Sequence, residues 1–133
     1  MTMSYYIETS ISGKGFDQVE ALVREALQSE GFGVLTEIDL NATLKKKLGV
    51  DFYAYKILGA CNPGFAYQAL QAEDKIGTML PCNVIIQEKE AGKIQVSAVD
   101  PMASMQAVEN DQLGKLAEEV RSKLQKVIEL LKA

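Results

Sequence analysis

The pattern of apolar, aromatic and β-branched residues along five short stretches of this chain predicts five β-strands. The stretches are residues 5–10, 33–40, 52–61, 83–88 and 93–99. In the third stretch, only Lys56 interrupts an apolar face, and the opposite face consists of Tyr53, Tyr55, Ile57, Gly59 and Cys61. A strand that is apolar on both sides normally lies in the middle of a sheet and is covered twice. We therefore expect the third strand to be central.

The other strands each predict one apolar side. In the second, Val34, Thr36 and Ile38 should share a side. The Glu90-Ala91-Gly92 turn predicts a hairpin between the fourth and fifth strands. The residues of this hairpin expected to face inward are Val84, Ile86, Ile94, Val96 and Ala98.

Apolar residues recur every three or four positions in the segments between the strands, which predicts helices. The predicted helices are residues 16–30, 41–48, 63–73 and 112–132. Gly31 should close the first as a C-cap, with Phe32 making the hydrophobic contact that often accompanies such a cap. In the short second helix, we expect Asn41 to be the N-cap and Leu44 and Leu48 to share the inner face.

The third predicted helix begins next to a cysteine. Asn62 is a favourable N-cap, because its side chain can accept a hydrogen bond from an amide that the helix leaves unpaired. Pro63 suits the first helical position, because it has no amide hydrogen to leave unpaired. Cys61 should therefore lie just before a helix N-terminus.

The order of these elements predicts the fold class, α+β. The first six main elements match a split βαβ core, with one strand and a terminal helix appended. The expected architecture is a two-layer sandwich of a five-stranded, mostly antiparallel sheet with helices on one face. In that topology, the end of the third strand and the start of the fourth flank the first strand at one sheet edge. Cys61 and Cys82 should then approach each other; whether they come within the roughly 7 Å between Cα atoms that a disulfide needs stays open.

Length and charge narrow the classes of function. With 133 residues, the chain predicts a single domain over residues 1–133. The formal net charge is −4 and the longest basic run is Lys45-Lys46-Lys47. Nucleic acid is therefore not expected as a partner.

No apolar run reaches the roughly 20 residues that cross a bilayer, and the segment from Met1 to Tyr6 lacks the features of a signal peptide. We expect a cytoplasmic protein with no membrane partner. The two cysteines should then be reduced. Histidine is absent, which removes imidazole-based catalysis and metal sites built on histidine.

Several motifs resemble domain-of-unknown-function family 302. They are Leu58-Gly59-Ala60-Cys61-Asn62-Pro63 with Ala66 and Leu70, then Leu80-Pro81-Cys82-Asn83-Val84, then Asp100-Pro101, together with the second strand from Gly31 to Ile38. The resemblance covers almost the whole chain, with Met79 standing where leucine is commoner. It implies a small α+β protein of bacteria and archaea that usually dimerises. It implies no activity and no catalytic residues.

The two Cys-Asn pairs are the candidate ligand-binding site, formed by Cys61, Asn62, Cys82 and Asn83. Three interpretations stay open. Both cysteines can be buried as small apolar residues, the commonest fate of a free cysteine. Cys61 beside a helix N-terminus can instead serve a thiol enzyme or redox protein. The third interpretation is a soft metal such as Cu(I) bound by the sulfur atoms of Cys61, Cys82, Met79, Met102 and Met105.

The function that we predict is a non-enzymatic binding or assembly module for an unknown small molecule, with a Cys-dependent enzyme or a soft-metal binder as the alternative. No cofactor is expected. We also predict a homodimer, because helices in one layer can cover only one face of the sheet. The other face, or the apolar seam of the last helix, would otherwise be exposed.

Overall fold

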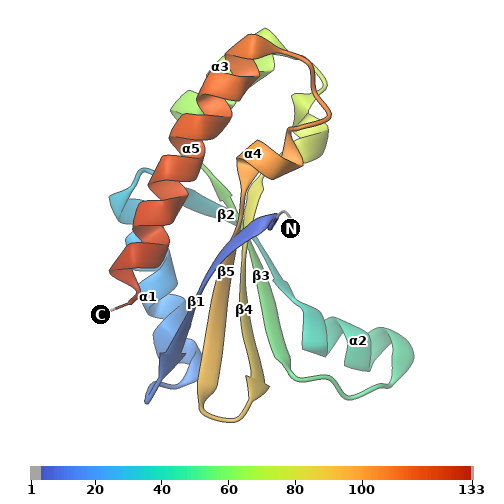
Figure 1. Cartoon of the computed structure of the whole chain (residues 1–133). Helices are drawn as coiled ribbons and strands as arrows, with labels where there is room; N and C mark the ends of the chain where they lie inside the picture. The colour runs from blue at the N-terminus through green and yellow to red at the C-terminus, as the bar shows by residue number, and fades with distance from the viewer. Residues whose placement is uncertain (1–3, 133) are drawn as a thin grey trace.

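The computed structural model describes residues 4–132. The first three residues of the Met1 to Tyr6 segment, which was predicted not to be a signal peptide, therefore lie outside the described residues. Five strands and their connecting helices make up this part of the chain (Figure 1). In chain order they are β1 (Tyr6–Ser12), α1 (Phe16–Ser29), β2 (Gly33–Asp39), α2 (Leu40–Leu48), β3 (Ala54–Cys61), α3 (Pro63–Ala72), the 3₁₀ turn η1 (Ile76–Met79), β4 (Cys82–Glu90), β5 (Lys93–Val99), α4 (Pro101–Ser104) and α5 (Asp111–Leu130). No helix within residues 4–132 is both long and apolar enough to span a bilayer.

The sheet is antiparallel throughout, in the order β1-β5-β4-β3-β2. The predicted α+β class is therefore confirmed. The predicted central position of β3 is wrong by one strand: β3 lies inside the sheet, between β4 and the edge strand β2, and the middle strand is β4. The split βαβ topology is wrong, because β3 and β4 pair directly instead of flanking β1. The tight hairpin explains the difference: it places β5 beside β4, so β1 pairs with β5 and becomes an edge strand.

One face of the sheet carries the main hydrophobic core, under α1 and α5 (Figure 1). The predicted inward residues of the hairpin are all fully buried there, and Leu58 and Ala60 of β3 join them. The helices contribute Val19, Val23 and Leu27 from α1 and Leu124, Val127 and Ile128 from α5. The apolar seam of the last helix is therefore covered within the chain.

Lys56 is the charged residue that interrupts this face of β3. Its ammonium group bonds the carboxylate of Glu20 at 2.7 Å and that of Glu37 at 3.2 Å. The hydrogen bond to Glu20 raises the pKa of Lys56, although partial burial acts in the opposite direction. The lysine is therefore accommodated at the edge of the core as a paired charge.

The opposite face of the sheet, which we call the open face, lies on the side away from α1 and α5 (Figure 1). Register and alternation place eighteen residues on it: Gly33, Thr36, Ile38, Tyr55, Ile57, Gly59, Cys61, Asn83, Ile85, Gln87, Lys93, Gln95, Ser97, Val99, Tyr6, Glu8, Ser10 and Ser12. The open face is hollowed by a groove of about 420 Å³, whose walls include Tyr5, Tyr6 and Tyr55.

A β-bulge changes the predicted pattern of β2. Val34 pairs with Ala60 on the core side, whereas Thr36 pairs with Gly59 on the open face. The register shift between them means that Val34 does not share a side with Thr36 and Ile38, as alternation had predicted. The extra residue, Leu35, is 69% exposed.

The short helix α2 projects away from the sheet (Figure 1). No residue of α2 is buried, and Leu48 is 69% exposed, so the predicted inner face is wrong. Its N-cap is Asp39 and not Asn41, because the Asp39 carboxylate accepts from the Ala42 amide at 3.1 Å. The Asn41 side chain accepts instead from the Tyr55 amide at 3.0 Å and so ties α2 to β3.

The end of α1 confirms the predicted glycine cap. Gly31 has a φ of 86°, which favours glycine, and the Phe32 amide donates to the Leu27 carbonyl at 2.9 Å. The Phe32 side chain is buried in the main core. This cap sets the position of Phe32, which lines the site described next.

Candidate functional site

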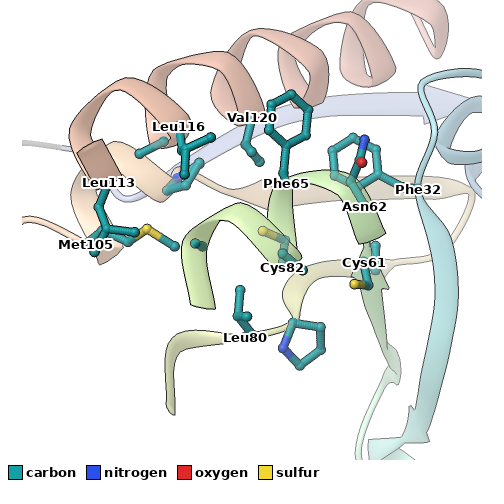
Figure 2. Close-up of a pocket in the computed structure, with 16 residues that line it drawn as sticks. Phe32, Cys61, Asn62, Phe65, Leu80, Cys82, Met105, Leu113, Leu116 and Val120 are labelled. Carbon is teal, nitrogen blue, oxygen red and sulfur yellow. The ribbon is translucent and has the colours of Figure 1, made fainter. Parts of the chain in front are cut away.

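An apolar pocket lies where β3 and β4 meet the helices α3, α4 and α5 (Figure 2). Its volume is about 40 Å³. Sixteen residues line it: Phe32, Ala60, Cys61, Asn62, Phe65, Ala66, Ala69, Leu80, Pro81, Cys82, Pro101, Met105, Leu113, Leu116, Ala117 and Val120. None of these residues carries a charged side chain. Three of the four residues of the predicted Cys-Asn site are thus part of one pocket.

The two cysteines lie on neighbouring strands, with their side chains on opposite faces of the sheet. Cys82 pairs with Ala60, so Cys61 is one position out of register with it. Figure 2 shows Cys82 beneath α3, while the sulfur of Cys61 points away from it. Both cysteines are free, Cys82 buried and Cys61 half-buried. Burial, with a smaller contribution from nearby Cys61, raises the pKa of the Cys82 thiol to about 11.

Asn62 does not cap α3 with its side chain, which corrects the predicted cap. It occupies the N-cap position without a side-chain hydrogen bond to the helix. Its Nδ2 donates instead to the Glu30 carbonyl at 3.4 Å, at the end of α1. The glycine that follows, Gly31, permits this approach, because a Cβ at position 31 would lie 3.0 Å from that nitrogen. Asn62 therefore joins the start of α3 to the end of α1.

The two roles of Asn62 are separated by replacing it with aspartate. Aspartate is as good an N-cap as asparagine but cannot donate to a carbonyl. We expect Asn62→Asp to lower the free energy of unfolding by about 1 kcal/mol, at least as much as Asn62→Ala does. Urea unfolding of both variants checks this. An Asn62→Asp protein as stable as the wild type would restore the capping role.

The remaining predicted site residues do not line this pocket, with the exception of Met105. Asn83 lies in the groove of the open face. Met79 and Met102 are 40% and 43% exposed, on η1 and α4. Of the proposed soft-metal set, Cys61, Cys82 and Met105 line this pocket, but the sulfur of Cys61 points away from that of Cys82. Within residues 4–132, no three Asp, Glu or Cys side chains are grouped as metal ligands.

The helical wall of the pocket is not among the site residues predicted from the sequence. This wall comes from α5, through Leu113, Leu116, Ala117 and Val120, and from Phe65 of α3. The small residues Ala66 and Ala69 of α3 and Ala117 of α5 were a usable signal, because small side chains at facing positions allow close approach or leave space. The small residues can be interpreted in this way only once the structure shows that α3 packs against α5.

The different burial of the two thiols predicts different reactivity. At pH 8, a thiol with a pKa of about 11 is ionised in only about one molecule in a thousand, and the thiolate is the reacting species. We expect a maleimide to label Cys61 at least about tenfold faster than Cys82 in the native protein. Peptide mapping after timed labelling measures both rates. Equal rates would contradict the assignment, and labelling in urea, where both thiols should react alike, is the control.

These features define the class as a small α+β protein in which a five-stranded antiparallel sheet carries helices on one face and an apolar pocket at one end. The chain belongs to the family described as "Domain of unknown function DUF302", whose profile matches residues 7–131. The resemblance drawn from the Cys-Asn motifs is therefore confirmed.

Two relatives support this assignment. A crystal structure of an uncharacterized conserved DUF302 protein from Bacillus stearothermophilus superposes with a TM-score of 0.88 at 25% identity, over 96% of this chain and 98% of that one. An uncharacterized protein of Aquifex aeolicus (strain VF5) is 28% identical over 90 residues. That match covers 68% of this chain and 56% of the Aquifex protein, so the similarity spans little more than half of that protein.

Proposed function

We propose that this protein is a non-enzymatic, homodimeric binding module, in which the open face forms the dimer interface and the apolar pocket takes a ligand. The main observation in support of a dimer is the low charge of the open face. Among its eighteen residues only Glu8 and Lys93 are charged, and Lys93 lies at the rim, next to the hairpin turn. Depletion of charge and enrichment in tyrosine are the marks of the buried centre of a protein interface.

Aromatic residues concentrate on this face. Of the five tyrosines in the chain, Tyr5, Tyr6 and Tyr55 line its groove, and Tyr53 accepts a hydrogen bond from Gln87 of the same face. Phe52 stacks on Tyr53 with ring centroids 4.1 Å apart. Exposed tyrosine and phenylalanine of this density favour contact with another protein surface.

The area of the open face suits a two-fold dimer. Five strands about 4.8 Å apart, each of about seven residues rising 3.3 Å, span a plane of about 550 Å². Side-chain relief brings the accessible surface close to the roughly 800 Å² per partner of a stable interface. A second copy presents the same face with little charge, and an isologous pair covers both faces at once. The partner that we propose is therefore a second copy of this chain.

The chemistry of the pocket supports binding in preference to catalysis. Its polar groups are already engaged, since Asn62 donates to the Glu30 carbonyl and the Cys82 thiol stays protonated at neutral pH. The alternative function, a Cys-dependent enzyme or redox protein, depends on Cys61. A titration of its thiol pKa decides between the two: a value near 8.5 supports the binding module, and a value well below 7 supports the enzyme.

The dimer is tested by the mass of the protein in solution. Light scattering at micromolar concentration should give about twice the chain mass of 14.6 kDa. A mass of 14.6 kDa under these conditions would contradict the proposed assembly. Measurement at high salt is a useful control, because an interface with so little charge should not dissociate when salt is added.

A further inference from the structure

The pocket sits between two separate hydrophobic clusters. Phe32, Ala60 and Cys82 belong to the main core under α1 and α5. Ala69 and Leu113 belong to a smaller cluster formed by α3, η1 and the start of α5, with Leu80, Met105 and Leu116 packed against it. The space is therefore left where two packed regions meet, and its walls come from both.

The walls of this pocket favour an apolar occupant. A volume of about 40 Å³ exceeds the roughly 10–15 Å³ that one water molecule needs. A buried water also needs two to four polar partners, and the lining offers almost none that are free of other bonds. The volume is also well below the roughly 150 Å³ of a cavity that admits benzene. The end of an alkyl chain fits this space, whereas a ring does not.

A second, polar groove lies next to the pocket, on the surface formed by α3 and α5. Leu116 lines both the pocket and this groove, which has a volume of about 430 Å³. Its other walls are Gln68, Gln71, Ala72, Gln112, Lys115 and Glu119. The three glutamine amides offer donors and acceptors, and the single lysine and single glutamate cancel in charge. The groove therefore matches a polar group that carries no net charge.

Taking the two spaces together, we infer that the pocket binds a single-chain amphiphile, with its alkyl end among Ala66, Ala69 and Cys82 and an uncharged, hydrogen-bonding head group in the glutamine-lined groove. This inference rests on the proposed binding role of the pocket and does not depend on the dimer. A carboxylate or an ammonium head fits less well, since the groove presents both signs of charge and an excess of neither.

The test uses n-octyl-β-glucoside below its micellar concentration as the probe. Calorimetric titration and thermal shift should show saturable binding of one molecule per chain. Octanoate and octyltrimethylammonium, which have the same alkyl length, should bind more weakly, and glucose alone should not bind. Gln112→Ala should weaken glucoside binding by about fivefold through loss of a head-group hydrogen bond.

Two variants fill the alkyl end of the pocket. Ala66→Leu and Ala69→Leu should each weaken glucoside binding by about tenfold or more, because the added side chain occupies the space. Both keep a strong helix former in α3, and the half-buried position of Ala66 makes its variant the safer of the two. Ala21→Leu, on the exposed side of α1, is the matched control and should bind like the wild type.

The outcomes separate this inference from the proposed function. The inference that the pocket binds an amphiphile would be overturned by either of two results. One is the absence of saturable glucoside binding, and the other is unchanged binding in both Ala66→Leu and Ala69→Leu. Tighter binding of a charged probe that Ala66→Leu abolishes would keep the pocket as a ligand site and reject the uncharged head group. The mass of each sample is measured in parallel, so a monomer that binds the glucoside would contradict only the dimer.

Discussion

Replacing Ile85 with glutamate is expected to convert the proposed dimer into a folded monomer. Ile85 is half-buried on β4 and lines the groove of the open face. In a two-fold interface the variant would bury two new carboxylates, with neither a basic partner nor water. A cost of about 4 kcal/mol weakens the dissociation constant by about a thousandfold. Sedimentation velocity at micromolar concentration should then report a single species of 14.6 kDa.

Leu70→Glu is the matched control for this variant. Leu70 is a partly exposed apolar residue of α3, 43% accessible, and lies outside the open face. The same chemical change there should leave the mass of the dimer unaltered. The far-UV circular dichroism spectra of both variants should match that of the wild type, which shows that a change in mass does not result from unfolding. If Ile85→Glu stayed dimeric, the interface would have to lie on another surface.

Replacing Gly59 with alanine is expected to cost about 2–3 kcal/mol of stability, the largest single effect that we predict for the fold. Gly59 lies on β3, where Thr36 of β2 and Pro81 pass directly over its Cα. A Cβ at this position would overlap the Thr36 hydroxyl and lie 2.7 Å from Cγ of Pro81. Neither neighbour yields easily, because one belongs to a paired strand and the other is a rigid ring.

Gly33→Ala is a close control for this substitution. Gly33 lies on the adjacent strand, and a Cβ there would meet nothing within 4 Å. Chemical denaturation should show Gly33→Ala near the wild type and Gly59→Ala well below it. The double variant Gly59→Ala with Thr36→Ala should recover part of the loss, because it removes one of the two overlaps. Equal stability of the two single glycine variants would show that the strands move apart at little cost.

The buried residues of the β4–β5 hairpin could be predicted from the sequence because alternation decides which side chains of a strand face the core. Val84, Ile86, Val96 and Ala98 were predicted to face inward and are fully buried. The Gly31 cap was also readable, because a left-handed helix end strongly favours glycine. These features depend on residues that are neighbours in sequence or on the regular alternation of apolar residues. Such patterns can be recognised without knowledge of the tertiary fold.

The features that were predicted wrongly depend on tertiary contacts. The bulge at Leu35 leaves no mark in the alternation of β2, yet it moves Thr36 and Ile38 to the open face. Asn62 has the composition of an N-cap, but the end of α1 offers its amide a carbonyl partner. Strand order likewise follows from which strands the hairpin places side by side, and the element order of the chain is compatible with more than one answer.

The grouping of the candidate site residues in the fold was predicted only in part for the same reason. The positions of Cys61 and Cys82 at strand ends predicted that they lie near each other, and both line the pocket. Alternation also puts Asn83 on the face opposite to Cys82, so the second Cys-Asn pair is divided between the pocket and the open face. The helical wall from α5 follows only from the packing of α3 on α5.

Quenching of tyrosine fluorescence shows whether a second copy of the chain covers the open face. Four of the five tyrosines lie at this face, the fifth, Tyr67, is 66% exposed on α3, and the chain contains no tryptophan. In a Tyr67→Phe background the fluorescence therefore reports on the open face alone. Acrylamide should quench it weakly at micromolar concentration and several-fold more strongly when Ile85→Glu is added. Equal quenching with and without Ile85→Glu would contradict a dimer formed through this face.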